Sequence, residues 1–232
     1  MPRATPTDRL PKLLDAAAGA FVEHGFQRTQ MDDIAERLGV SKGTVYRAVD
    51  SKESLFAAVI EWGDHTGDTP AEGLTTSADL AAVAARITTE LAAAVAALEL
   101  TTIVATRRRL RSSDAFGNEL ERATAELHRV MRSRRTAVMV LDRCAAEIPE
   151  LAAVWFGDGR YALVDLWTDF LAMRANVVTS DVDRDVLART IVELVTTWAV
   201  KMPWDRAPRP YPDDTAGACA AMVRDLVIGA PR

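Results

Sequence analysis

The chain has 232 residues, 49% of them hydrophobic, which is enough apolar material for a sizeable core and excludes wholesale disorder. Lys and Arg number 28 against 33 Asp and Glu, and the net charge of −5 excludes a uniformly basic surface. A nucleic-acid binder needs only a local basic patch, so this balance still allows one.

The first helical pattern ends at Gly25, a residue that tolerates the left-handed conformation of many C-terminal caps. Its apolar side chains recur at helical spacing, with Pro11 in the first turn, where a missing N–H costs little. The stripe consists of Leu10, Leu13, Leu14, Ala17 and Phe21. The spacing predicts an amphipathic helix.

Residues 29–56, TQMDDIAERLGVSKGTVYRAVDSKESLF, contain two short helical patterns that meet at a tight turn. We expect Thr29 to cap the first helix, Gly39 to end it, and Ser41 to cap a second helix beginning at Lys42. Ser51 starts a further helix. Two helices joined by a short turn containing Gly form a helix-turn-helix, whose second helix can enter the major groove of DNA.

This segment resembles the DNA-binding domain of the TetR family of bacterial transcriptional regulators. The resemblance rests on LLDAAAGAFVEHGF, DDIAERLGVSKGTVY and SKESLF at fixed offsets. It implies a three-helix DNA-binding head at residues 1–56 and a larger helical domain at 57–232 for effector binding and dimerisation.

Candidate DNA-binding residues surround the second helix. Gly43 allows close approach, the first turn of a recognition helix reaches base edges, and hydroxyl and cationic side chains bind phosphates. Two phosphate contacts are expected at helix starts, where N–H groups favour anions. The set is Thr29, Ser41, Lys42, Gly43, Thr44, Tyr46, Arg47 and Lys52.

Each of these residues also has an ordinary structural explanation. Tyr46 and Val45 could be core residues, and Arg47 and Lys52 could be solvated charges. Charge does not decide the matter, because residues 1–60 hold eight Lys or Arg and eight Asp or Glu. The family often has an aromatic residue or His at position 48, and Ala48 removes one expected phosphate contact. Only the ordered set, with its spacing, favours DNA binding.

The C-terminal part is helical throughout by the same periodicity. Residues 63–77 are rich in Gly, Thr, Pro and Asp and predict the main linker. Helices are expected near 77–100, 101–112, 115–146, 160–176, 183–201 and 213–228. No convincing period-2 pattern occurs, so the fold class is all-α with about nine or ten helices.

Two helices, 160–176 and 183–201, are apolar on nearly every face, which requires burial on all sides. Two such helices in a chain of this size indicate a partner, and the resemblance implies a homodimer joined through a four-helix bundle. The candidate dimer interface is Leu163, Phe170, Leu187, Ile191, Leu194 and Trp198.

The resemblance also implies a small-molecule effector among the middle helices. Large apolar or polarisable side chains there are the candidate pocket: Trp62, His128, Met131, Met139, Trp155 and Trp167. Met and Trp at helical spacing are also ordinary core residues, and a single His among charged neighbours is a common surface residue.

Nothing in the chain indicates catalysis, a cofactor or a metal site. The three His residues have no metal-ligand spacing, and no nucleophile elbow or phosphate-binding loop occurs. Cys144 and Cys219 have no pairing pattern, which suits a reducing cytoplasm. We recognise neither a secretion signal nor an apolar stretch of about 18 residues, the length needed to span a membrane.

The sequence therefore predicts a ligand-responsive regulator of transcription that is not an enzyme. It would bind a palindromic double-stranded operator as a homodimer and, in the family's usual mode, repress until an effector releases it. The alternative is an all-α dimer that has lost specific DNA binding and acts through ligand or protein contacts.

Overall fold

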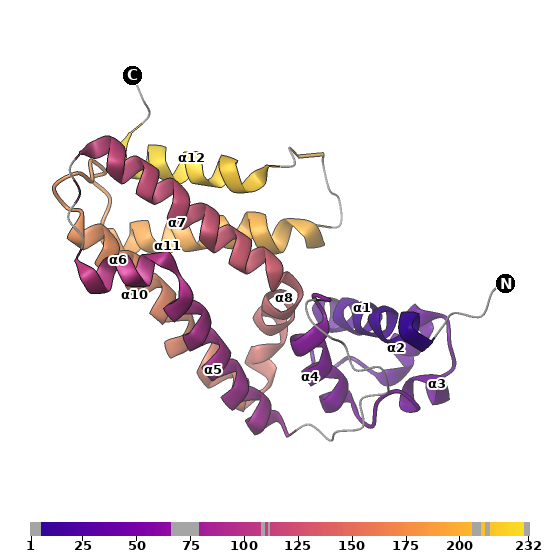
Figure 1. The fold of residues 1–232 in the computed structure, drawn as a ribbon. Coiled ribbons are helices and arrows are strands. Elements are labelled where there is room, and N and C mark those ends of the chain that lie inside the picture. Colours follow the sequence, from indigo (N-terminus) through magenta and orange to yellow (C-terminus); the bar gives the residue numbers. More distant parts are fainter. Residues whose placement is uncertain are drawn as a thin grey trace. The chain divides into compact units, whose positions relative to one another are not determined.

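The computed structural model describes residues 6–65, 79–107, 110, 112–205, 210–211 and 214–229. Within these ranges the chain forms twelve α-helices and no strand, so the all-α prediction is confirmed with more helices than expected (Figure 1). The chain divides into two compact units, Met1–Thr88 with Arg134–Gly157 and Thr89–Ser133 with Asp158–Arg232.

The first unit contains the four N-terminal helices and a later segment that packs on them. Its elements are α1 (Pro6–His24), α2 (Met31–Leu38), α3 (Lys42–Tyr46), α4 (Lys52–Trp62), the first half of α5 (Leu80–Ala97), α8 (Arg135–Cys144), the short helix η1 (Ala145–Glu147) and α9 (Pro149–Trp155). Three rings form its aromatic centre, with centroids 5.1–6.0 Å apart: Phe21, Phe26 and Phe56. Edge-to-face contacts of this kind stabilise a small core beyond area burial alone.

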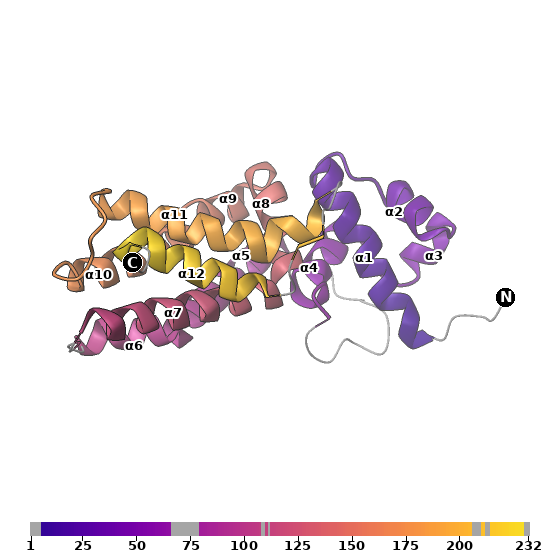
Figure 2. The ribbon, with the colours of Figure 1, turned by 90° about the horizontal axis from the view of Figure 1, so that it is seen from above.

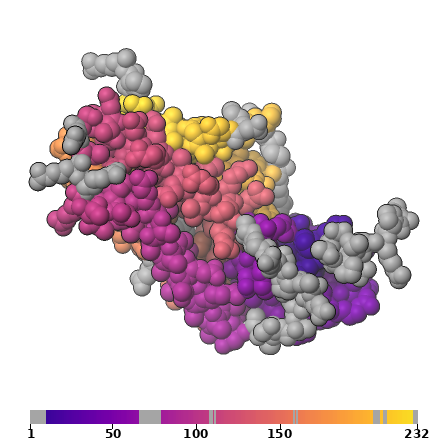
Figure 3. Space-filling model, in the orientation of Figure 1, coloured from indigo at the N-terminus to yellow at the C-terminus, as the bar shows by residue number. Residues whose placement is uncertain are grey.

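The second unit is a helical bundle. Its elements are the second half of α5, α6 (Glu99–Thr106), α7 (Ser113–Ser133), α10 (Asp158–Met173), α11 (Arg184–Thr196), the π-helix η2 (Thr197–Lys201), η3 (Met202–Trp204) and α12 (Thr215–Ile228). The last helix, α12, lies along α7 (Figures 2 and 3), and α11 packs against both of these helices. Phe116 of α7 and Trp167 and Phe170 of α10 are fully buried at its centre.

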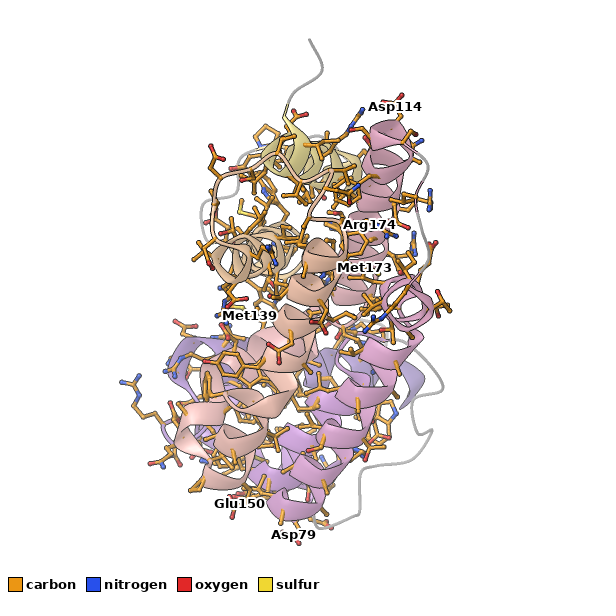
Figure 4. The ribbon with its side chains drawn as sticks, turned by 90° about the vertical axis from the view of Figure 1, so that its left-hand side faces the viewer. Asp79, Asp114, Met139, Glu150, Met173 and Arg174 are labelled. Carbon is orange, nitrogen blue, oxygen red and sulfur yellow. The ribbon has the colours of Figure 1, made fainter. Side chains whose placement is uncertain are left out.

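A buried ion pair joins α7 to the end of α10. Two guanidinium nitrogens of Arg174 donate to the Glu119 carboxylate, Nε to Oε2 at 3.0 Å and Nη2 to Oε1 at 3.3 Å. The two side chains are 5% and 0% exposed. Figure 4 shows Arg174 beside α7. Two charges buried this deeply are tolerated only because they compensate each other.

The long helix predicted over 115–146 is wrong, because two helices meet there at Arg134. Its backbone leaves the helical region (φ −123°, ψ 24°). Asp64, which follows α4, accepts hydrogen bonds from the N–H groups of Thr136 (2.8 Å) and Ala137 (3.2 Å). An unbroken helix would need these N–H groups for its own ladder. A tertiary contact therefore decides a break that no Gly or Pro marks.

Most local signals in the first 60 residues are confirmed. Gly39 ends α2 in the left-handed conformation at φ 71°, and the Ser51 hydroxyl accepts from Ser54 N to cap α4. The expected cap at Thr29 is wrong. Gln30 caps α2 in a reciprocal box with Asp33, whose Oδ2 accepts from Gln30 N at 2.8 Å. Of the predicted linker at 63–77, residues 66–77 lie outside the described residues.

The helix α5 is long and apolar enough to cross a membrane by length and composition, with a mean hydropathy of 1.5. Among the described residues it is the one helix of this kind. Arg86 and Glu90 interrupt its apolar sequence, so it contains no uninterrupted apolar stretch of about 18 residues. Arg86 forms an ion pair with Glu61 of α4, and Val83 and Ile87 are buried. We interpret α5 as a core helix of the fold.

Candidate DNA-binding surface and helical core

The candidate recognition helix α3 is short, and two apolar side chains anchor it. Val45 and Val49 are each 1% exposed and pack into the head. The core interpretation of Val45 is thus confirmed, and Val49 fills the position where the family often has Phe. Because these anchors face inward, the opposite side of α3 faces solvent.

That outer side carries most of the predicted DNA-binding residues. Ser41, Lys42, Gly43, Tyr46 and Arg47 are exposed, and Thr44 is half-buried. Tyr46 is 45% exposed, which rules out the alternative that it is a core residue. Hydrogen bonds connect the polar side chains of this surface. Arg47 Nη2 donates to Thr44 Oγ1 at 3.1 Å, and the Ser41 hydroxyl lies 3.0 Å from the same Thr44 oxygen.

Gly43 leaves an open space at the start of α3. A Cβ atom built on it would meet nothing within 4 Å, so the fold of the chain itself does not need a glycine there. A glycine inside a helix lowers helix stability by roughly 0.8–1.0 kcal/mol relative to alanine. Internal packing therefore gives no reason to keep this position without a side chain.

Lys42 forms an ion pair on the same surface. Its Nζ lies 2.9 Å from Asp32 Oδ2, and the hydrogen bond and charge of Asp32 raise the pKa of Lys42. Both side chains are more than half exposed, so the pair is open to competition by solvent and by phosphate.

The Asp32–Lys42 pair yields a test by substitution. In Asp32→Asn, Lys42 loses its competing carboxylate and the surface loses a charge that repels phosphate. We expect tighter DNA binding with the largest gain at low salt, because counterion screening weakens the effect at high salt. Fluorescence anisotropy over a salt series measures it. Glu36→Gln, an equal charge change at an exposed site of the same helix, is the control, and equal gains in both variants would contradict the prediction.

Two predicted phosphate contacts lie away from this surface. Thr29 is fully buried, and its hydroxyl donates to the carbonyls of Gly25 (2.6 Å) and Ala20 (3.2 Å). Lys52 Nζ donates to the carbonyls of Phe26 (2.8 Å) and Thr29 (3.2 Å) and lies 4.6 Å from the Phe26 ring centroid. Both side chains bind the turn between α1 and α2.

The candidate effector-pocket residues divide equally between the two units. Trp62, Met139 and Trp155 belong to the first, and Trp155 Nε1 donates to Asp142 Oδ1 at 3.4 Å. The alternative that His128, in the second unit, is a surface residue is wrong. Its side chain is 3% exposed, and its Nε2 lies 3.2 Å from Thr215 Oγ1.

Burial, reinforced by nearby Arg132, lowers the pKa of His128, although Asp214 partly offsets this. In the same unit the Met131 sulfur accepts from Thr196 Oγ1 at 3.3 Å. Trp167 is fully buried, and its indole N–H has no partner among the described residues.

The candidate dimer residues differ in accessibility. Phe170, Leu187 and Ile191 are at most 1% exposed and fill the core of their own unit. Leu163, Leu194 and Trp198 are half-buried. The two helices predicted to be apolar on every face are thus largely buried by other helices of the same chain. Sequence periodicity cannot distinguish this burial from burial by a partner chain.

Metal and thiol chemistry find no support in the described residues. No group of three His, Cys, Asp or Glu side chains there could hold a metal ion. Cys144 and Cys219 are free and buried, as expected. Burial raises the pKa of the Cys144 thiol to about 12, so it remains protonated near neutral pH.

Comparison with known proteins decides the family. A model of the bacterial regulatory proteins of the tetR family matches residues 13–59, the span of the four-helix N-terminal segment. Residues 13–59 therefore form a DNA-binding domain of the TetR family. Its α2 and α3 are the helix-turn-helix of that domain. The family is not one of enzymes, which agrees with the prediction from sequence.

Curated relatives match the TetR-family head alone. The transcriptional activator FasR of Mycolicibacterium smegmatis is 43% identical over 54 residues, 23% of this chain and 25% of the relative. The transcriptional repressor KstR2 of Rhodococcus jostii is 40% identical over 52 residues, 22% of this chain and 26% of the relative. The chain thus matches about a quarter of the length of these relatives.

Solved structures extend the likeness of fold over nearly the whole chain. The ketosteroid transcriptional regulator KstR2 of Mycobacterium tuberculosis has a TM-score of 0.53 at 17% identity, covering 95% of each chain. A TetR regulator family member of Streptomyces coelicolor has a TM-score of 0.53 at 19% identity, covering 100% of this chain and 95% of the other. At these identities the likeness shows a shared fold alone.

Proposed function

We propose that this protein is a cytoplasmic, ligand-responsive regulator that binds an inverted-repeat DNA operator as a homodimer and represses transcription until an effector releases it. The observation that carries the proposal is the outer side of α3. Two buried valines hold a short helix whose bare Gly43 is flanked by Lys42, Tyr46 and Arg47. This arrangement suits close approach to a groove, with cationic and hydroxyl donors for phosphates and base edges.

A dimer would place two such helices on one duplex. A two-fold axis requires an inverted repeat, with half-sites roughly one helical turn, about 34 Å, apart. Because Phe170, Leu187 and Ile191 are covered within the chain, the contact would use half-buried Leu163, Leu194 and Trp198. It would extend to the exposed apolar stripe of α12, which consists of Ala218, Ala221, Met222 and Leu226.

An effector is proposed from the core of the second unit. A buried donor without an acceptor costs roughly 1–3 kcal/mol, and such groups need an explanation. The unpaired N–H of Trp167 would be satisfied by a largely apolar molecule carrying a carbonyl or ether oxygen. An effector that shifts α4 would change the spacing of the two heads, and a coupling of roughly 1–3 kcal/mol would change operator affinity about 5- to 150-fold.

Selection of bound duplexes from a random-sequence pool tests the proposal. We expect an enriched inverted repeat, binding by two chains per site in sedimentation, and a steep loss of affinity with salt. A chain that sediments as a monomer at micromolar concentration would remove the dimer. Failure to enrich any sequence would favour the alternative dimer that acts through protein contacts, for which the engagement of Thr29 and Lys52 inside the head is the supporting observation.

A further inference from the structure

The helix α8 is fastened at its start to the segment that follows α4. Asp64 places its carboxylate over the first turn of α8 and accepts from the N–H groups of Thr136 and Ala137. Gly63 packs directly against Thr136, since a Cβ at Gly63 would lie 3.0 Å from its Cγ2. A carboxylate at a helix N-terminus satisfies free N–H groups and complements the helix dipole.

The other end of this segment is fastened to the turn between α1 and α2. Glu147, the last residue of η1, accepts from Gln27 N through Oε2 at 2.8 Å, and the Gln27 side chain donates back to the Glu147 carbonyl at 3.2 Å. Arg143 Nη1 holds the second carboxylate oxygen at 2.8 Å. We call Gln27, Arg143 and Glu147 the clasp.

The clasp fits closely and favours the charged carboxylate. Partial burial alone would raise the pKa of Glu147, but the Gln27 N–H and Arg143 outweigh it and lower that pKa from its ordinary value. Gly25 lies beside it at φ 83°, and a Cβ there would come within 2.2 Å of Glu147 Oε1. Glycine at this position therefore serves both the backbone conformation and the close approach of the clasp.

The turn held by the clasp also sets the start of the helix-turn-helix. The ammonium group of Lys52, in α4, also binds this turn. It donates to the backbone carbonyls of Phe26, Gln27 and Thr29. The turn leads directly into Gln30, which caps α2, and α3 packs on α2. A movement of Glu147 would thus move the α1–α2 turn, and with it α2 and the recognition helix α3.

The division into compact units agrees with this connection. Residues 134–157 group with the N-terminal residues 1–88, and the non-helical Arg134 separates them from α7. The segment α8–η1–α9 is therefore fastened at two places far apart in the sequence, at Asp64 after α4 and at Gln27 in the head.

We propose that α8–η1–α9 is a working part of the DNA-reading head and that Glu147 is a positioning residue for α2 and α3, acting through Gln27. The inference rests on the proposed function, since it names the route by which the C-terminal part regulates DNA reading. Glu147 touches no DNA in this proposal. Its loss should therefore loosen the reader without removing a phosphate contact.

The test compares Glu147→Ala with Glu150→Ala in the full chain. Glu150 carries the same charge, lies three residues further on and points away from the helices (Figure 4). The first readout is hydrogen exchange of the Gln27 amide, followed by NMR. The second is affinity for the duplex selected by the unchanged chain, measured across a salt series at a temperature well below melting.

For Glu147→Ala we expect Gln27 amide exchange at least tenfold faster and operator affinity at least fivefold weaker than for Glu150→Ala. The slope of affinity against salt should match that of the unchanged chain, because no phosphate contact is lost. If Glu147→Ala does not fold, Glu147→Gln replaces it. This variant keeps an acceptor for Gln27 but loses the charge that Arg143 holds, and intermediate effects are expected.

Equal affinities of the Glu147 and Glu150 variants, or an unchanged Gln27 exchange rate, would overturn the positioning role while leaving the proposed function intact. A reduced salt slope would also overturn it, because Glu147 would then be influencing a phosphate contact directly. Absence of salt-dependent DNA binding by the unchanged chain would instead reject the proposed function, and the positioning role with it.

Discussion

Replacing Gly43 by alanine is expected to stabilise the head and yet weaken operator binding. The new Cβ meets nothing within the chain, so the helix gains roughly 0.8–1.0 kcal/mol. At the DNA interface the same methyl occupies the approach to the groove. Overpacking costs roughly 1–3 kcal/mol, which corresponds to about 5- to 150-fold in affinity. Chemical denaturation and anisotropy on the same preparation measure both effects.

Gly39→Ala provides the opposite control. That glycine also has open space around it, but its φ of 71° strains an L-residue. We expect Gly39→Ala to lose roughly 1–2 kcal/mol of stability and, below melting, to lose less affinity than Gly43→Ala. If Gly43→Ala binds DNA as well as the unchanged chain, the close approach proposed for α3 does not occur.

Breaking the buried pair in the second unit is expected to be the most damaging single change in stability. In Arg174→Met, the fully buried Glu119 loses its compensating charge. Removal of one partner of such a pair costs roughly 3–5 kcal/mol. Urea unfolding followed by circular dichroism should show the loss as a lower midpoint with a similar slope.

The double variant Glu119→Leu/Arg174→Met separates charge from packing. With both charges gone no ion remains buried, and most of the lost stability should return. Arg189→Met is the matched single control, because Arg189 pairs with Glu193 on a partly exposed helix face and should cost less than about 1 kcal/mol. A double variant as unstable as Arg174→Met would show that packing, and not the buried charge, dominates.

The predicted DNA-binding residues differ in how accessible their side chains are. Lys42, Gly43 and Tyr46 lie on the exposed side of α3, because the spacing that turns Val45 inward is local. Thr29 and Lys52 were expected at phosphates on the strength of their positions at helix starts. Both instead donate to carbonyls of the α1–α2 turn, whose path depends on the packing of Phe26 in the head.

The clasp shows the limits of sequence reasoning most clearly. The Glu-Ile-Pro-Glu-Leu fragment at 147–151 suggests a turn between helices, but nothing in it indicates that Glu147 binds a residue 120 positions earlier. Asp64 likewise appears as a linker residue. In the sequence these two contacts are marked only by Gly25 and Gly63. Each glycine stands where another segment of the chain approaches closely.

Sequence periodicity and caps determined the helical class, the helix-turn-helix and the exposed side of α3, because these depend on residues within a few positions of one another. The tertiary structure alone decided the break at Arg134, the fastening of α8 to Asp64 after α4, and the burial of Phe170, Leu187 and Ile191 in their own unit. Those features depend on which distant surface satisfies an N–H group or covers an apolar face, and a helical period is the same whichever surface does so.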